Sequence, residues 1–236
     1  MKRFFVAGTD TNVGKTLVSV ALLEAAKAKG LKTTALKPVA AGCERGLSEP
    51  DATLPVTQLL NKDALDLQSA ITEALPYSIL NPIALEPAIA PHIAALQQSS
   101  VLGAERIYQS CQPALSTASD FMLIEGAGGW RVPLNDKQTM ADLAVMFACP
   151  VVLVVGMRLG CINHGLLSAE AIANDGLTVA GWVANQVDPV MSVVDENIET
   201  LTQRFPFPLL GHIPFLSKPS GIEASRFLDI DKLLDN

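Results

Sequence analysis

The chain has 236 residues, of which 49% are hydrophobic and 17% charged. This balance excludes a disordered chain, a collagen-like repeat and a small disulfide-stapled protein. Seventeen Lys and Arg against 24 Asp and Glu give a net charge of −7, so we expect neither nucleic acid nor an anionic membrane as a partner. The length fits a single α/β domain over residues 1–236.

Short apolar runs alternate with helical patterns along the chain. Continuous apolar runs predict strands buried on both faces, and their alternation with helices predicts a doubly wound, mainly parallel sheet with helices on both faces. The expected strands are Arg3–Ala7, Thr33–Lys37, Phe121–Ile124, Val151–Val155, Val179–Asn185 and Leu209–Ile213. The expected helices are Gly14–Lys29, Asn163–Asn174 and Val190–Phe205, with a short helix from Asp229. Ligands of such sheets bind at the carboxyl ends of the strands.

The segment Leu75–Pro91 departs from this alternation, because Pro76, Pro82, Pro87 and Pro91 fall within sixteen residues. Proline interrupts helices, so we expect a long ordered loop without a helix. Two interpretations remain open. The segment is either a plain connector or a wall of the active site.

The longest strongly apolar run, Pro150–Met157, has eight residues and is far too short to cross a bilayer. The start of the chain does not have the pattern of a signal peptide, because only a short apolar run precedes Gly8. We therefore expect a soluble cytoplasmic protein.

The strongest motif is GTDTNVGKT at Gly8–Thr16, directly after the first expected strand. In a P-loop, backbone amides surround a phosphate, a lysine contacts the terminal phosphates, and a Ser or Thr hydroxyl binds Mg²⁺. Lys15 and Thr16 fit the last two roles, and the following helix would direct its amino end at the phosphates. The loop has one residue more between its glycines than the standard motif. The sequence predicts a phosphate-binding loop and a P-loop NTPase-like fold.

A second motif, EGAGG at Glu125–Gly129, follows the strand Phe121–Ile124. An acidic residue in that position, beside a P-loop, is typical of the carboxylate that holds Mg²⁺. The alternative is a glycine turn that carries an incidental acid. Given the P-loop, the metal role is favoured.

Two further charged positions carry weaker signals. Lys37 ends the second expected strand and would lie at the same edge of the sheet as the P-loop, where a second cation could stabilise phosphoryl transfer. Taken alone, such a lysine is more typical of a solvated strand end. Asp63 and Asp66 lie on an expected helix, and either could reach the metal, although each alone is more typical of a surface acid.

Together these motifs resemble the dethiobiotin synthetase family. The lengthened P-loop is that family's own form, and the matching segments extend in family order across nearly the whole chain. They are Gly8–Thr16, Lys37–Gly42, Lys62–Leu67, Asn81–His92, Glu125–Leu134, Pro150–His164, Gly181–Asn185 and Leu209–Leu216.

The resemblance implies an enzyme that uses ATP and Mg²⁺ to carboxylate 7,8-diaminononanoate with CO2 and to close a cyclic urea. In that family one amine captures CO2 as a carbamate, and the carbamate attacks the γ-phosphate to give a carbamic–phosphoric anhydride. The second amine then attacks the carbonyl and expels phosphate. No protein nucleophile is required, but a metal and two lysines offset repulsion between the anionic groups.

The resemblance also implies residue roles. The catalytic residues would be Lys15, Lys37 and Thr11, and the Mg²⁺ ligands would be Thr16, Asp63 and Glu125. The nucleotide would contact Asn12, Val13, Gly14, Lys15, Thr16, Leu17, Asp63, Glu125, Gly126, Ala127, Gly128, Asn185, Gln186, Pro214, Phe215, Leu216 and Glu223, with Asn185 as the adenine reader. The substrate would contact Thr11, Lys37, Ala41, Gly128, Gly160, Cys161, Ile162 and Asn163. The segment Gly160–Asn163 would serve the partner's site in a homodimer.

One departure from the family pattern keeps alternatives open. The family often has a hydroxyl residue where this chain has Ala41, so a catalytically divergent paralogue remains an alternative. A ParA/MinD-type switch ATPase is a second alternative, but those proteins carry a lysine where this chain has Asp10. A cobyrinate-type amidotransferase would need a fused glutaminase domain, for which the sequence leaves no room.

Overall fold

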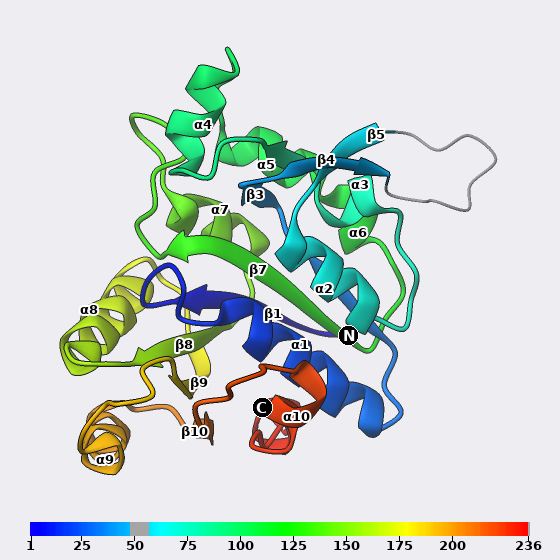
Figure 1. Ribbon diagram of the computed structural model, residues 1–236. Coiled ribbons are helices and arrows are strands. Elements are labelled where there is room, and N and C mark those ends of the chain that lie inside the picture. Colours follow the sequence, from blue (N-terminus) through cyan, green and yellow to red (C-terminus); the bar gives the residue numbers. More distant parts are fainter. Residues whose placement is uncertain (48–56, 236) are drawn as a thin grey trace.

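The computed structural model describes residues 1–47 and 57–235, and its centre is a six-stranded sheet (Figure 1). The strand order is β10-β9-β8-β1-β7-β2, and every neighbouring pair is parallel. The strands are β1 (Lys2–Gly8), β2 (Thr33–Leu36), β7 (Phe121–Gly129), β8 (Val151–Met157), β9 (Val179–Gln186) and β10 (Leu209–Ile213). The expected α/β fold with a mainly parallel sheet is confirmed.

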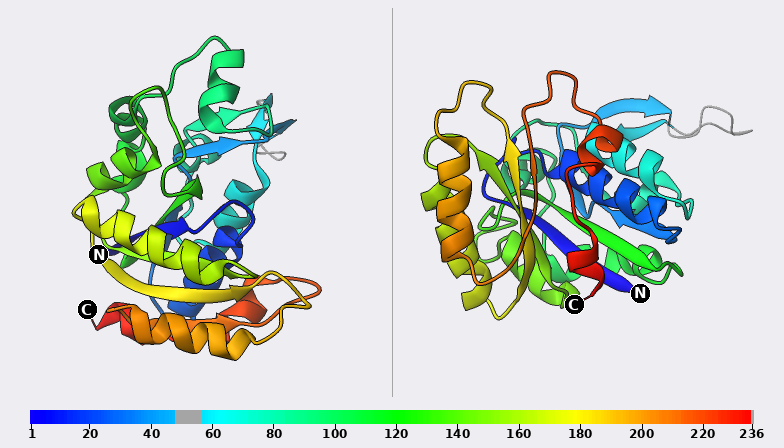
Figure 2. Two further views of the ribbon diagram at one scale, coloured as in Figure 1. Left: turned by 90° about the vertical axis from the view of Figure 1, so that its left-hand side faces the viewer. Right: turned by 90° about the horizontal axis from the view of Figure 1, so that it is seen from below.

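Helices cover both faces of this sheet, and their burial explains the continuous apolar runs (Figure 2). Helix α1 (Lys15–Ala28) packs against α2 (Lys62–Ala70) and α10 (Gly221–Ser225). Helix α8 (Cys161–Asn174) packs against β8 and α9 (Val194–Arg204). All seven residues of β8 are buried, as its unbroken apolar sequence predicts.

Two smaller sheets lie beyond the end of β2. Strand β3 (Val39–Ala41) pairs in parallel with β6 (Ile83–Leu85), and β4 (Glu44–Leu47) pairs antiparallel with β5 (Thr57–Leu60). The remaining helices are α3 (Tyr77–Leu80), α4 (Pro91–Gln97), α5 (Ala104–Ser110), α6 (Gln112–Leu115), α7 (Met140–Phe147) and α11 (Asp231–Leu234). Within the described residues, no helix combines the length and apolarity needed to span a membrane.

The expectation of a helix-free loop at Leu75–Pro91 is wrong, because the segment contains α3 and β6. The prolines stand at the ends of these elements rather than inside them. Pro76 is the N-cap of α3, Pro82 follows its C-cap, and Pro91 is the first residue of α4. Proline is well tolerated at the first position of a helix, so none of these prolines breaks an element.

Several element boundaries also differ from the predictions, among them the start of the last helix, α11, at Asp231 rather than Asp229 and the end of β8 at Met157 rather than Val155. Helix α9 begins at Val194 rather than Val190, because Val193 has a φ of 51° and forms its N-cap. Helix α8 begins two residues early, at Cys161. Strand β7 continues through its glycines to Gly129. A side chain at Gly126 would approach the Phe5 ring to 3.0 Å, so glycine lets this strand pass close to β1.

Candidate active site

The loop between β1 and α1 has the curvature of a phosphate-binding loop. Asn12 (φ 60°) and Gly14 (φ 83°) both adopt the left-handed conformation, which turns the chain sharply before α1. A Cβ on Gly14 would come within 2.1 Å of the Asn185 Nδ2 atom, so no larger residue fits there. The amino end of α1 therefore begins directly behind the loop, where a phosphate would be attracted.

Lys15 is the first residue of α1, and its side chain folds back over the loop. Its Nζ atom donates to the Asp10 carbonyl oxygen at 3.0 Å. Burial, together with the positive charge of Lys37, lowers the pKa of Lys15 to about 8, although nearby carboxylates partly oppose the shift. A phosphate group would supply the negative charge that this buried lysine needs.

Lys37, Glu125 and Thr16 form a buried cluster beside the loop. The Glu125 Oε1 atom accepts from Lys37 Nζ at 2.6 Å and from Thr16 Oγ1 at 2.8 Å. Lys37 Nζ also lies 3.3 Å from the Gly126 carbonyl oxygen and 3.4 Å from Asp63 Oδ2. The lysine is only 3% exposed, so it is not the solvated strand-end lysine that its position alone suggests.

The charge of Lys37 is maintained despite its burial. Burial favours the neutral amine, but the Glu125 and Asp63 carboxylates outweigh that effect and raise the pKa of Lys37 above its ordinary value. The side chain is therefore a buried ammonium group held by two carboxylates. Such a group can stabilise negative charge that develops during a reaction far better than a solvated lysine.

The same cluster fits a magnesium ion. The Glu125 Oε2 atom is buried and has no hydrogen-bond partner among the described residues. The Thr16 hydroxyl donates to the other oxygen of this carboxylate, Oε1, and the half-exposed Asp63 carboxylate faces the cavity. Mg²⁺ is usually held by one or two carboxylates together with phosphate oxygens and water. Asp66 is not part of this cluster, because it pairs with Lys62 at 2.5 Å.

Within residues 1–47 and 57–235, no cluster of three or more His, Cys, Asp or Glu could hold a metal by itself. The two carboxylates and one hydroxyl are the donor set that suits a Mg²⁺ ion completed by phosphate oxygens and water.

A cavity of about 770 Å³ lies over this cluster. Its lining brings together the P-loop, the Lys37–Ala41 segment, the amino end of α2, the end of β7 and the turn before α4. Residues predicted to bind ligands that line it are Thr11, Asn12, Gly14, Lys15, Thr16, Lys37, Ala41, Asp63, Ala127 and Gly128. Ala88, Ile89, Ala90 and Pro91 also line it, which favours the active-site-wall interpretation of that segment.

Other predicted site residues lie outside this cavity. Asn185 is buried, and its Nδ2 atom donates to the Val13 carbonyl oxygen at 2.8 Å, so it supports the back of the P-loop. Gly160 is the N-cap of α8, and Cys161 is buried at its first turn. The remaining residues outside the lining are Val13 in the P-loop, Leu17 on α1, the buried Glu125 and Gly126 on β7, Gln186 at the end of β9, Pro214, Phe215 and Leu216 after β10, Glu223 on α10, and Ile162 and Asn163 on α8.

Asn61 is the main polar residue of this site that sequence reasoning missed. It is the N-cap of α2 and lines the cavity between Ala41 and Asp63. The signal was present, because an asparagine directly before a helical pattern is a typical N-cap. Ala40 and Val132, which also line the cavity, carry no such signal.

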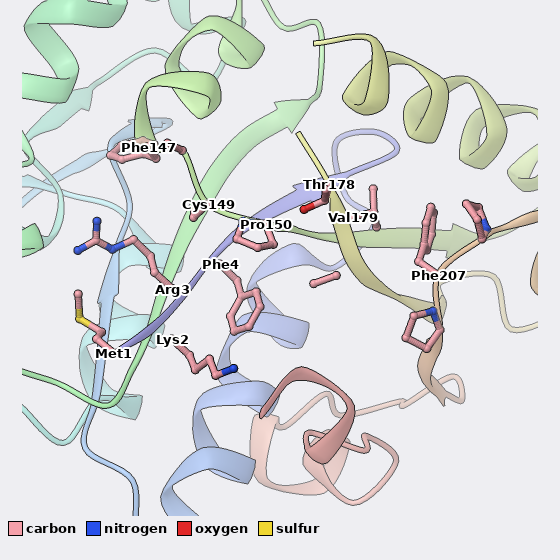
Figure 3. A pocket seen from close by; sticks show the side chains of 14 residues that line it. Met1, Lys2, Arg3, Phe4, Phe147, Cys149, Pro150, Thr178, Val179 and Phe207 are labelled. Atoms are coloured by element: carbon pink, nitrogen blue, oxygen red, sulfur yellow. The ribbon is translucent and has the colours of Figure 1, made fainter. Parts of the chain in front are cut away.

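A second cavity, of about 760 Å³, lies at the opposite end of the sheet (Figure 3). Figure 3 shows Arg3, Phe147, Cys149, Pro150 and Phe207 around it, near the amino ends of the strands. No P-loop residue lines it. Ligands of parallel sheets bind at the carboxyl ends, so the cavity over Lys37 and Glu125 is the candidate active site.

Comparisons with known proteins agree with this geometry. A family described as an AAA domain matches residues 2–222. The ATP-dependent dethiobiotin synthetase of Cellvibrio japonicus is 55% identical over 234 residues, which cover 99% of this chain and 98% of that protein. The enzyme of the same name from Pseudomonas aeruginosa is 50% identical over 234 residues, with the same coverage.

Solved structures show the fold alone. The septum site-determining protein MinD from Pyrococcus horikoshii has a TM-score of 0.54 at 17% identity, covering 100% of this chain and 90% of that one. A ParA family ATPase from Chlorobium tepidum has a TM-score of 0.51 at 13% identity, covering 100% and 90%. With full-length relatives at 50–55% identity and a P-loop site in place, the chain belongs to the ATP-dependent dethiobiotin synthetase family.

Proposed function

We propose that the protein catalyses the ATP- and Mg²⁺-dependent carboxylation and ring closure of 7,8-diaminononanoate with CO2, giving dethiobiotin, ADP and phosphate. The observation that carries the proposal is the buried Lys37 ammonium, which adjoins the P-loop cavity and is held by Glu125 and Asp63. A buried cation beside a phosphate site suits a reaction in which anionic oxygens must approach one another. Residues 1–236 would act as one synthetase domain.

The proposed reaction has three steps. One amine of the substrate adds to CO2 and loses a proton, which gives a carbamate. A carbamate oxygen attacks the γ-phosphorus of ATP, and the bond to ADP breaks. The second amine then attacks the carbonyl carbon and loses a proton, the bond to phosphate breaks, and the cyclic urea closes. No atom of the protein forms a covalent bond in this sequence.

The residues of the cavity divide these tasks. Lys15 and the backbone amides of the P-loop would bind the phosphates of ATP, supported by the amino end of α1. Lys37 would pair with the carbamate and stabilise charge on the transferring phosphoryl group. Thr11 and Gly128 adjoin each other at the cavity wall, where a Cβ on Gly128 would lie 3.5 Å from Thr11 Oγ1, and they would orient the diamine.

Thr16, Asp63 and Glu125 would hold Mg²⁺, and the partnerless Glu125 Oε2 atom supports that assignment. The ion, when bound, supplies positive charge that neutralises the phosphate oxygens. Asn185, Gln186, Pro214–Leu216 and Glu223 would surround the adenosine.

A homodimer is part of the proposal. The turn before α8 carries Leu159, which is 96% exposed, and α8 itself exposes Leu167. Exposed apolar side chains of this kind are typical of a subunit interface. Gly160–Asn163 lie beside Leu159 and outside the cavity of their own chain, so they would complete the substrate site of a partner subunit in a cytoplasmic dimer.

The alternatives are less well supported. Asp10 occupies the position of the ParA/MinD signature lysine, and here it forms an ion pair with Arg158. The interpretation as a divergent paralogue depends on Ala41 alone. Five other residues of the proposed site are all in place around it, namely Lys15, Thr16, Lys37, Asp63 and Glu125.

The deciding experiment measures phosphate release from ATP and Mg²⁺, with and without 7,8-diaminononanoate and bicarbonate, with mass detection of the organic product. Release that depends on the diamine, with a cyclic urea as product, is the expected result. ATP turnover that is indifferent to the diamine would contradict the proposal and favour a switch ATPase or a paralogue with another substrate.

A further inference from the structure

One buried segment binds both backbone polar groups of Lys37, its N–H and its carbonyl oxygen. Strand β2 is an edge strand of the main sheet and ends at Leu36, so the next residue has no strand partner there. Instead, the Lys37 N–H donates to the Leu80 carbonyl oxygen at 2.8 Å, and the Lys37 carbonyl oxygen accepts from Asn81 Nδ2 at 2.7 Å. The end of α3 thus takes the place of a neighbouring strand.

A chain of hydrogen bonds continues from Asn81 to the helix that carries Asp63. The Tyr77 hydroxyl donates to Asn81 Oδ1 at 3.0 Å and accepts from the Asn61 N–H at 2.7 Å. The Asn61 Oδ1 atom then caps α2 by accepting from the Asp63 N–H at 3.0 Å. The chain therefore links the backbones of the two residues whose side chains meet at 3.4 Å in the active site.

The direction of every bond in this chain is determined. The Asn61 N–H can only donate, so the Tyr77 oxygen accepts there and directs its own proton at Asn81 Oδ1. The Lys37 carbonyl can only accept, so the Asn81 amide nitrogen must face it. Burial raises the pKa of Tyr77 to about 12, so the phenol keeps its proton.

Burial makes the chain rigid. Tyr77 is 2% exposed and Asn81 is 3% exposed, and water cannot replace a broken bond easily in such surroundings. Fully satisfied buried networks of this kind hold their members in one arrangement. Apolar side chains of similar shape would fill the same space and would need no hydrogen-bond partners. The polar network therefore does more than fill space, because it also fixes the positions of the groups that it joins.

We propose that Tyr77 and Asn81 are positioning residues of the active site, which set the place of Lys37 relative to Asp63 and the P-loop. This proposal rests on the proposed function, because it assigns to Lys37 a role in the transition state. Neither residue touches the cavity, so each acts through Lys37 and Asn61. Loss of the chain would move the ammonium group without removing it.

The test replaces Tyr77 by Phe, which removes one oxygen atom and leaves the Asn61 N–H and Asn81 Oδ1 without partners. Thr72→Val is the matched control. The Thr72 hydroxyl accepts from the Thr33 N–H at 2.7 Å, so its removal cuts a similar bond at the other end of the same strand. The melting temperatures of both variants are measured by circular dichroism. Their kcat and ATP dissociation constants are measured at a temperature where both are folded.

We expect Tyr77→Phe to lower kcat about 10- to 100-fold, because small displacements of a positioned group have effects of that size. The ATP dissociation constant should stay within about twofold of wild type, since Lys37 acts in the transition state. Thr72→Val should keep kcat near the wild-type value. A kcat loss shared equally by both variants, or a Tyr77→Phe variant with wild-type kcat, would overturn the proposal.

Asn81→Leu is a second variant that breaks the same chain, and it tests the proposal even if Tyr77→Phe does not fold. The double variant should lose no more kcat than the more damaging single variant, because both changes cut one chain. If the kcat loss of the double variant equals the product of the two single losses, the two residues act independently. That result would contradict a role in one hydrogen-bonded chain. Wild-type protein without diamine-dependent phosphate release would instead refute the proposed function, whatever the variants do.

Discussion

Lys37 and Glu125 form a buried ion pair in which the carboxylate Oε1 atom lies 2.6 Å from the ammonium and 2.8 Å from the Thr16 hydroxyl. One oxygen atom thus connects the end of β2 to the start of α1. Because Glu125 is fully buried, its charge depends on these two partners and on whatever the free Oε2 atom binds. The pair therefore couples the proposed catalytic lysine to the proposed metal ligand.

Lys37→Ala should lower turnover by orders of magnitude while largely sparing ATP binding, because Lys37 acts mainly in the transition state. The variant should also unfold more easily, since loss of one partner from a buried ion pair costs about 3–5 kcal/mol. Turnover, ATP affinity by calorimetry and melting temperature are the measurements. Lys62→Ala is the control, because Lys62 is an exposed lysine. Near-normal turnover of Lys37→Ala would refute the assignment.

Asp63→Asn should raise the Mg²⁺ concentration needed for half-maximal activity by about tenfold or more, since a charged ligand is replaced by a neutral one. Asp66→Asn is a matched control on the same helix, because Asp66 pairs with Lys62 away from the cavity. Activity is titrated with Mg²⁺ at saturating ATP. An equal shift in both variants would remove Asp63 from the metal site.

Replacement of Asn185 by Ala should relax the preference for ATP over GTP, because the proposed partner of adenine is lost. The same side chain donates to the Val13 carbonyl oxygen, so a general loss of nucleotide affinity is also expected. The ratio of the ATP and GTP dissociation constants separates the two effects. A parallel loss for both nucleotides would assign Asn185 to support of the P-loop alone.

Ala41→Ser adds a hydroxyl group to the wall of the cavity beside Lys37. If it pairs with the substrate, the hydrogen bond should contribute about 0.5–1.5 kcal/mol and lower the KM for the diamine up to about tenfold. The KM for ATP should not change. An unchanged KM for the diamine would mean that a hydroxyl at this position does not bind the substrate.

His212 should make the protein less stable in acid. Burial lowers its pKa below 6.5, and Asp195 only partly opposes that shift. The unfolded chain therefore binds more protons between 6.5 and the lowered value, so the free energy of unfolding should fall as the pH falls through this window. Melting curves from pH 7.5 to 5 measure the slope. The slope should be smaller for His212→Gln, and an identical slope would exclude His212 as the cause.

The sequence predicted the parts of the fold that depend on local pattern. Unbroken apolar runs such as β8 are readable, because burial on both faces leaves no polar positions. The P-loop and Lys37 were predicted because each follows a strand at its carboxyl end, and Glu125 because it stands where the apolar run of β7 stops. Val190 and Val193 misled the helix prediction, because apolar residues also occur singly in exposed turns.

The hydrogen-bonded chain through Tyr77 could not be predicted in this way. Its members come from three separate segments and meet only because α3 packs against the end of β2. Hydrophobic periodicity carries no information about which buried polar groups face one another. Only the three-dimensional arrangement shows that the proline-rich segment holds the backbone of Lys37.

The contact between Gly14 and Asn185 has a consequence for nucleotide capture. Asn185, on β9, also donates to the Val13 carbonyl oxygen at 2.8 Å, so the folded sheet itself supports the curvature of the P-loop. The conformational entropy of the loop is therefore lost during folding and does not oppose ATP when it arrives. The binding free energy of the phosphates is therefore not reduced by the cost of ordering the P-loop.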